Sequence, residues 1–277
     1  MGLFNNYSKP GPGVNKNAPR AKGFALFLEL YFRKLGSYLQ LNLFYFTSLI
    51  PSIAILWHIL MTILNDLSAF NEETAMAGTI LTAILAIVIS CAFGLSPFSA
   101  GFHYVLRNFS FEKHAFTFTD FIDKFRENKK NSIIMYLIDL ILVCVMLLSL
   151  RFYFILSTGS SLFVAPLTIL ILVLIVFALM TPYKWTMLVT FDLNKRQIYK
   201  NALFFVLGDL KTTFKHFIAT FIYVLISVAL VYLHFLFGII FFVIFGVAAY
   251  GLISQLNIYK QMQDFIAQSP GGHENIN

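Results

Sequence analysis

The chain has 277 residues, of which 58% are hydrophobic, 17% aromatic and only 12% charged, with a formal net charge of +7. A soluble domain could not bury so much apolar surface, so the composition excludes an ordinary globular protein and predicts a membrane protein. The positive charges flank the apolar stretches, where anionic lipid headgroups attract them, so we expect lipid rather than nucleic acid as their partner.

The N-terminal residues 1–22 are basic and rich in Pro and Gly, which predicts a flexible segment rather than a cleavable signal peptide. The mostly apolar residues 23–40 come next. Four polar residues recur among them at helical spacing: Glu29, Arg33, Ser37 and Gln40. A narrow polar stripe on an apolar helix is typical of a helix that lies in the membrane interface.

Six apolar stretches are long enough to cross a bilayer, which requires roughly 20 mainly apolar residues. We expect spans at 41–64, 76–104, 132–154, 163–190, 214–234 and 236–257. The last boundary follows from length alone, because no Lys, Arg, Asp or Glu lies between Phe217 and Ser254. The predicted fold is all-α: one domain over residues 23–260 with six transmembrane helices, short cytoplasmic amphipathic helices and a flexible cytoplasmic tail at 261–277.

The basic residues alternate between the connections. Six precede the first span, six lie between the second and third, and a third group of six runs from Lys184 to Lys215. The opposite connections contain Arg151 and three acids, Asp66, Glu72 and Glu73. The positive-inside rule then places both termini in the cytoplasm and requires an even number of spans.

Two cytoplasmic connections contain helical patterns. In the first, one face is apolar and Thr117 is a candidate N-cap; the apolar face consists of Phe118, Phe121, Ile122 and Phe125. This face could rest on the membrane surface or dock a cytoplasmic partner. In the second, we expect Asn194 to cap a helix that Gly208 ends, with Asp209 at the start of the next helix.

The dipeptides Ser96-Pro97 and Thr181-Pro182 lie 85 residues apart, and basic residues recur at the same offset. The pattern is consistent with an internal duplication, with both units in the same orientation. Each proline removes a helix hydrogen bond, so we expect kinks at Pro97 and Pro182 and freed carbonyls at Phe93 and Ala178. Such kinks could serve packing or could line a path for a solute.

Two charges lie deep inside predicted spans. Asp139 is about eight residues inside the third span, and Lys184 is about eight residues before Asp192, at the cytoplasmic end of the fourth, so each charge lies at roughly 12 Å depth for a rise of 1.5 Å per residue. Because pairing offsets the cost of such charges, we predict a buried Asp139–Lys184 ion pair, with Tyr136 as a hydrogen-bond donor. The pair could fix helix register or couple to a proton or solute, and the alternative is that both groups reach the interface separately.

Motifs for catalysis are missing from the sequence. It contains no GxGxxG, GxxxxGK[ST], HExxH or GxSxG. Cys91 and Cys144 have no metal-ligand spacing, and the six His residues are scattered. We therefore expect no enzyme activity, no metal and no cofactor.

Three stretches resemble the YesL-like family, bacterial multi-pass membrane proteins with a domain of unknown function. They are GPGVNKNAPRAKGFALFLELYFRKLGSYLQLNLFYF (Gly11–Phe46), SPFSAGFHYVLRNFSFEKHAFTFTDFIDKFRENKKNS (Ser96–Ser132) and FDLNKRQIYKNALFFVL (Phe191–Leu207). The resemblance implies a helical protein of the bacterial plasma membrane and provides no catalytic residues. Because genes of this family often accompany carbohydrate uptake genes, it implies an accessory or regulatory component with importer subunits as partners. The alternative is a small secondary transporter with a polar path between the two repeat units.

Overall fold

A computed structural model describes residues 22–66 and 75–268 of the chain, and all regular structure in these ranges is helical, as predicted. The helices are α1 (Phe24–Arg33), α2 (Leu35–Asp66), α3 (Ala75–Ala92), α4 (Ser99–Ser110), α5 (Thr117–Glu127), α6 (Lys129–Gly159), α7 (Val164–Leu188), α8 (Lys195–Gly208), α9 (Leu210–Leu233), α10 (Phe235–Ile244) and α11 (Gly246–Gln268). A single 3₁₀ turn, Ser161–Phe163, precedes α7. Residues 261–268, predicted as a flexible tail, continue α11, whereas residues 1–21 and 269–277 lie outside the described ranges.

Four helices are long and apolar enough to cross a membrane: α2, α6, α7 and α9. The pair α10 and α11 passes the same test as one span bent by 51°, and α3 is a shorter apolar helix. Only 11% of the most apolar part of α7 is buried inside the protein. Apolar surface of this extent requires a lipid or protein neighbour.

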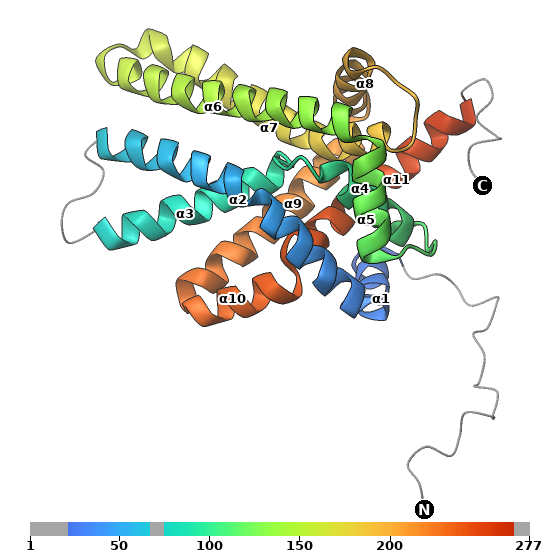
Figure 1. Ribbon diagram of the computed structural model, residues 1–277. Coiled ribbons are helices and arrows are strands. Elements are labelled where there is room, and N and C mark those ends of the chain that lie inside the picture. Colours follow the sequence, from blue (N-terminus) through green and yellow to red (C-terminus); the bar gives the residue numbers. More distant parts are fainter. Residues whose placement is uncertain (1–21, 67–74, 269–277) are drawn as a thin grey trace, which may run out of the picture.

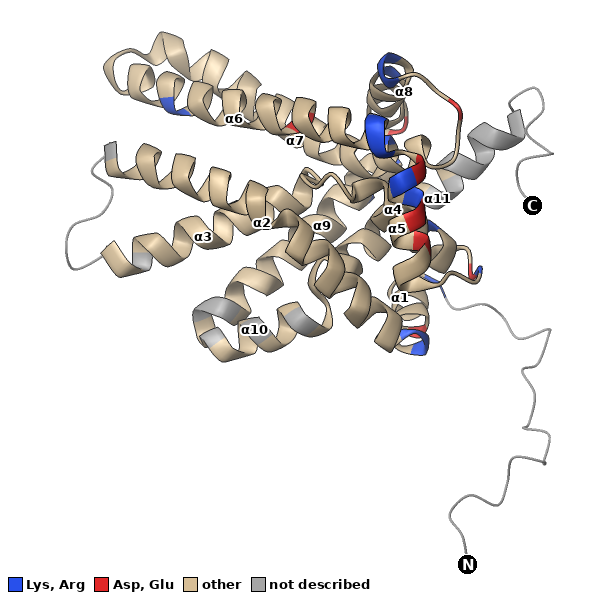
Figure 2. Cartoon of the chain, in the orientation of Figure 1, with Lys and Arg blue, Asp and Glu red and all other residues tan. Residues whose placement is uncertain are grey.

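The long helices form two hairpins that point away from the charged end of the molecule. Figure 1 shows α6 beside α7 and α2 beside α3, with α9 and α10 forming a further pair below them. In Figure 2 the charged segments gather around α1, α4, α5 and α8, at the opposite end from the tips of the α2/α3 and α6/α7 hairpins.

The predicted interfacial helix at residues 23–40 is two helices. α1 ends at Arg33, and α2 begins at Leu35. Three apolar residues of α1 are buried, Phe27, Leu30 and Tyr31, and they pack in a cluster with α2, α4 and α11. One face of α1 therefore belongs to the protein core, whereas Phe24 and Phe32 remain exposed.

The predicted span at 76–104 is broken. α3 ends at Ala92 and α4 begins at Ser99, so Pro97 lies in the break and does not kink a continuous helix. Gly94 adopts φ of 59°, and a Cβ there would lie 2.8 Å from the indole nitrogen of Trp185. The backbone carbonyls freed by the break are bonded by side chains, since the Ser99 hydroxyl donates to the Gly94 carbonyl at 2.8 Å and the Ser132 hydroxyl donates to that of Pro97 at 2.5 Å.

The other predicted proline kink lies in a helix that does not break. Pro182 is inside α7, which remains helical to Leu188. The two halves of the proposed duplication therefore differ locally at their matching prolines.

The predicted span at 236–257 is also broken, between α10 and α11. Gly246 adopts φ of 37° at this point. Side chains from distant helices bond the free backbone groups: Tyr31 donates to the Ile244 carbonyl at 2.5 Å, and Asn42 accepts from the Ala248 amide at 2.7 Å. Tyr223 donates to the Gly246 carbonyl. The break is therefore part of the packed structure.

The surface helices lie close to where the sequence predicts them. Asn194 forms a capping box with Gln197 at the start of α8, and α8 ends at Gly208, both as predicted. Asp209 caps α9, accepting from the Thr212 amide at 3.1 Å. In α5 the predicted N-cap is one residue late, because Thr117 is the first helical residue.

Candidate functional site

A buried ion pair joins α6 to α7. Lys184 Nζ lies 2.9 Å from Asp139 Oδ2, and both side chains are fully buried at 0% exposure. The predicted pair is confirmed. It belongs to a large hydrophobic cluster that α2, α3, α6, α7 and α8 build together, so the two charges compensate each other away from water.

The hydrogen-bond donor to this pair is Tyr199 and not Tyr136. The Tyr199 hydroxyl, on α8, donates to Asp139 Oδ1 at 2.6 Å. Tyr136 faces α2 instead, where its hydroxyl accepts from Ser52 at 3.2 Å. Burial, reinforced by the Asp139 carboxylate, raises the pKa of Tyr199, which keeps its hydroxyl protonated and able to donate.

Aromatic rings surround the ammonium group of the pair. Lys184 Nζ lies 4.1 Å from the ring centre of Phe177 and 5.0 Å from that of Tyr199. The quadrupole of an aromatic face attracts a cation, most strongly where water is excluded. A carboxylate and two rings thus hold the ammonium group in place of a hydration shell.

A second set of polar side chains lies close to the ion pair and comes from α4, α7 and α11. Gln255 of α11 donates through Nε2 to Thr186 Oγ1 of α7 at 2.7 Å, and the same nitrogen lies 3.3 Å from His103 Nδ1 of α4. All three side chains are buried. Thr186 is two residues from Lys184, so α7 contributes to both polar groups.

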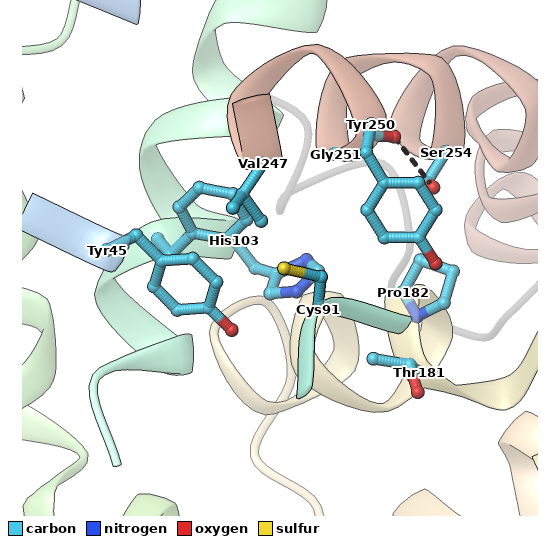
Figure 3. A pocket seen from close by; sticks show the side chains of 10 residues that line it. Tyr45, Cys91, His103, Thr181, Pro182, Val247, Tyr250, Gly251 and Ser254 are labelled. Atoms are coloured by element: carbon cyan, nitrogen blue, oxygen red, sulfur yellow. Dashed lines mark hydrogen bonds between the residues drawn. The ribbon is translucent and has the colours of Figure 1, made fainter. Parts of the chain in front are cut away.

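A small cavity of about 10 Å³ lies between α2, α3, α4, α7 and α11 (Figure 3). Its wall includes Tyr45, His103, Thr181 and Tyr250. Among the described residues the buried Thr181 hydroxyl has no hydrogen-bond partner. A polar cavity of this volume has the size of a single water site.

Both broken helices reach this cavity. Cys91, one residue before the end of α3, lines it together with Val247 at the start of α11, and Pro182 contributes from α7. Half-helix ends inside a membrane expose backbone dipoles that continuous helices do not, and transporters use such ends to bind substrates and ions. The cavity between the two breaks can therefore hold one species of the size of a water molecule.

The predicted docking face on α5 packs inside the protein. Phe121 is 3% exposed, and its ring stacks 5.9 Å from that of Phe98. Phe125 lies 4.1 Å from the same ring, and Ile122 packs against the neighbouring cluster. Of the four residues only Phe118 is exposed, at 58%. The prediction is wrong for Phe121 because α4, bent inward by the break after α3, lies directly beneath α5.

Comparison of the chain with family models, with curated proteins and with solved structures gives no match. The resemblance to YesL-like proteins therefore stays a prediction.

Metal ligands do not cluster in the part of the chain that the structure describes: no group of three or more His, Cys, Asp or Glu is placed to hold an ion. The polar centre is thus built from hydrogen-bonding side chains, one ion pair and two helix breaks. Tyr199 is the main residue that sequence reasoning missed, although its place on the apolar face of α8 already indicated an inward side chain.

Proposed function

We propose that the protein is a six-span integral membrane protein of the bacterial plasma membrane that moves a small solute across the bilayer as a secondary transporter. The proposed spans are α2, α3 with α4, α6, α7, α9, and α10 with α11. Both termini lie in the cytoplasm, where the basic residues of the charged end contact anionic headgroups.

The observation that carries this proposal is the meeting of two broken helices at one buried polar cavity. Backbone that is not helical is tolerated at membrane depth where it is enclosed by protein or lines a solute site. Here Cys91, three residues before Gly94, and Val247, next to Gly246, line the same cavity, and α7 closes it with Thr181 and Pro182. Packing alone does not require two breaks at one place.

The ion pair is the proposed coupling element. A movement that separated Lys184 from Asp139 would leave a buried unpaired ammonium, which favours a rearrangement that exposes it to water. α7 carries Lys184, Thr186 and Thr181 within two turns. A movement of α7 would therefore change the ion pair and the cavity together.

Reconstitution in liposomes tests this function. Proteoliposomes that contain a pH-sensitive dye should show uptake of protons when a transported small solute is added outside. Asp139→Asn should abolish the coupled proton movement, while Ser149→Ala, at an exposed hydroxyl of α6 that bonds to Val145 in the same helix, should not. Fluxes of wild-type protein equal to those of protein-free liposomes, over a broad solute panel, would overturn the proposal.

The accessory role in carbohydrate import is the second candidate, and it rests on the resemblance to YesL-like proteins. Two exposed phenylalanines at the charged end favour it: Phe116 is 67% exposed and Phe118 58%. Exposed aromatic residues of this kind are typical anchors of protein interfaces.

Copurification tests the accessory role. If importer subunits bind here, Phe116→Ser combined with Phe118→Ser should remove them from the purified protein in mild detergent. The matched control is Phe152→Ser. The Phe152 side chain is also 58% exposed, but it lies near the end of α6 that is farther from α5 in sequence. If Phe152→Ser also lost these subunits, the loss would be a general effect of replacing an exposed aromatic residue and would not place the binding site at Phe116 and Phe118.

A further inference from the structure

A larger cavity lies beside the polar centre, between α2, α3, α9, α10 and α11. Its volume is about 500 Å³. Its wall is formed mainly by apolar side chains, among them Leu43, Phe46, Val88, Val224 and Phe241. We call this cavity the apolar cleft.

The chemistry of the wall excludes a charged or sugar-like ligand. Among the residues that the structure describes, no Lys, Arg, Asp, Glu or His lines the apolar cleft. Its polar side chains bond to the protein itself: Asn42 to Ala248 and Ile244, Tyr223 to Gly246, and Ser227 to the carbonyl of Tyr223. A polar ligand entering the cleft would lose its water without gaining hydrogen bonds from these groups.

The position of the apolar cleft indicates its surroundings. Two of its helices, α2 and α9, are long and apolar enough to cross a membrane. α3 and α10 carry no charged residue, and in α9 the two lysines, Lys211 and Lys215, precede the part that lines the cleft, which begins at Thr220. The cleft therefore lies at the depth where the solvent is hydrocarbon, and an apolar space left empty there would lose dispersion contacts along its whole wall.

We propose that the apolar cleft binds a hydrocarbon chain of a membrane lipid. Its volume lies within the range of roughly 300–1,000 Å³ that is common for ligand pockets. The occupant is a lipid chain rather than a peptide, because backbone groups could not be paired along an apolar wall. The inference depends on the cleft alone, and it holds whether or not the protein moves a solute.

The chain in the cleft would touch the partition between the two cavities. Cys91, Val247 and Tyr250 line both the apolar cleft and the small polar cavity, and all three are labelled in Figure 3. One layer of side chains thus separates lipid from the polar centre. Occupation of the cleft would support this layer from its apolar side.

Photo-crosslinking in nanodiscs tests the proposal directly. A phospholipid with a diazirine in its acyl chain is incorporated, and the crosslinked peptides are mapped by mass spectrometry. We expect crosslinks concentrated on the cleft segments of α3 and α9. A uniform distribution over the exposed faces of α6, α7 and α9, with none in the cleft, would overturn the proposal.

Variants that fill the cleft provide the second arm. Val88→Trp and Val224→Trp should lose the phospholipid that copurifies with the wild-type protein in mild detergent. Ile222→Trp, on an exposed part of α9 outside the cleft wall, should retain it. A folded cleft variant that keeps as much phospholipid as the control would contradict the assignment.

The reaction rate of the Cys91 thiol gives a third test of lipid binding, which needs no bulky substitution. In the Cys144→Ser background, where Cys91 is the only cysteine left, the thiol should react more slowly with a membrane-permeant maleimide in phospholipid nanodiscs than in delipidated detergent micelles. Adding phospholipid back to the micelles should restore protection. An unchanged reaction rate under all three conditions would show that no lipid chain reaches the cleft.

Discussion

The buried ion pair and its hydrogen-bond donor come from three helices: Asp139 from α6, Lys184 from α7 and Tyr199 from α8. Depth along the predicted spans was enough to pair Asp139 with Lys184, because a charge within a membrane needs a partner at the same level. The same reasoning proposed Tyr136, the nearest tyrosine in sequence. It could not find Tyr199, which reaches the carboxylate from α8, 60 residues further along the chain.

A double-mutant cycle should reveal the ion pair. Asp139→Asn leaves a buried ammonium without its partner and should destabilise the protein by about 3–5 kcal/mol. Adding Lys184→Met should recover part of this loss, because the stranded charge is removed. The measurement is thermal unfolding in detergent, and strictly additive losses would show that the two side chains do not interact.

Loss of the tyrosine hydroxyl should be milder. Tyr199→Phe removes one hydrogen bond to a charged group and should cost about 1.5–3 kcal/mol of unfolding free energy. The control is Tyr136→Phe, which removes only the longer bond from Ser52 and should cost less. Equal losses in the two variants would argue against Tyr199 as the principal donor.

At the scale of elements, the sequence predicts the helical type of the structure better than the continuity of its helices. The stretches 76–104 and 236–257 are apolar throughout, so local pattern favours unbroken spans. Their breaks depend on glycines in left-handed conformations and on bonds from residues such as Asn42, 206 positions away from Ala248. The cap of α8, in contrast, is local to Asn194 and Gln197, and the sequence predicts it correctly.

Asn42 should be important for the break between α10 and α11. Its carbonyl oxygen accepts from the Ala248 amide, and its amide donates to the Ile244 carbonyl at 3.2 Å. Asn42→Ala leaves both backbone groups without these bonds and should cost about 1–3 kcal/mol in thermal unfolding. Asn257→Ala, which removes a bond to Ile253 one turn earlier in the same helix, is the control and should cost less.

The crossing of α4 and α5 depends on a glycine. A Cβ at Gly101 would lie 2.0 Å from the Phe121 carbonyl oxygen, so Gly101→Ala must push α5 away from α4. We expect a loss of about 1–3 kcal/mol, as for other overpacked cores. Gly36→Ala in α2 meets open space and should be neutral or slightly stabilising, because alanine is the better helix former. Similar unfolding temperatures for both variants would contradict the close packing.

At the scale of the whole molecule, charge and apolar surface separate along one direction. The sequence already predicts this separation, because basic residues alternate between connections, and the structure places most charged segments at one end, with Arg151 on α6 as an exception. Sequence reasoning did not foresee that α1, α4 and α5 pack into the core at that end. An amphipathic sequence pattern shows which face of a helix is apolar, but it does not show whether lipid or protein covers that face.

Cysteine labelling on intact cells should establish the orientation. In a background without Cys91 and Cys144, a cysteine at exposed Ser160 should react with an impermeant thiol reagent. Cysteines at exposed Asp123 and Arg196, both at the charged end, should react only after the membrane is opened. Labelling of Asp123→Cys from outside would reverse the proposed topology.

The short connection between α6 and α7 has a consequence for biosynthesis. Only Ser160 and one 3₁₀ turn separate the two helices, and each carries one member of the ion pair. A nascent chain that ends before α7 would hold Asp139 without a countercharge, which disfavours release of α6 alone into lipid. Once α7 is synthesised, the two helices can leave the insertion machinery as a hairpin in which Asp139 and Lys184 are paired. The order of translation thereby sets the moment at which α6 becomes compatible with the bilayer.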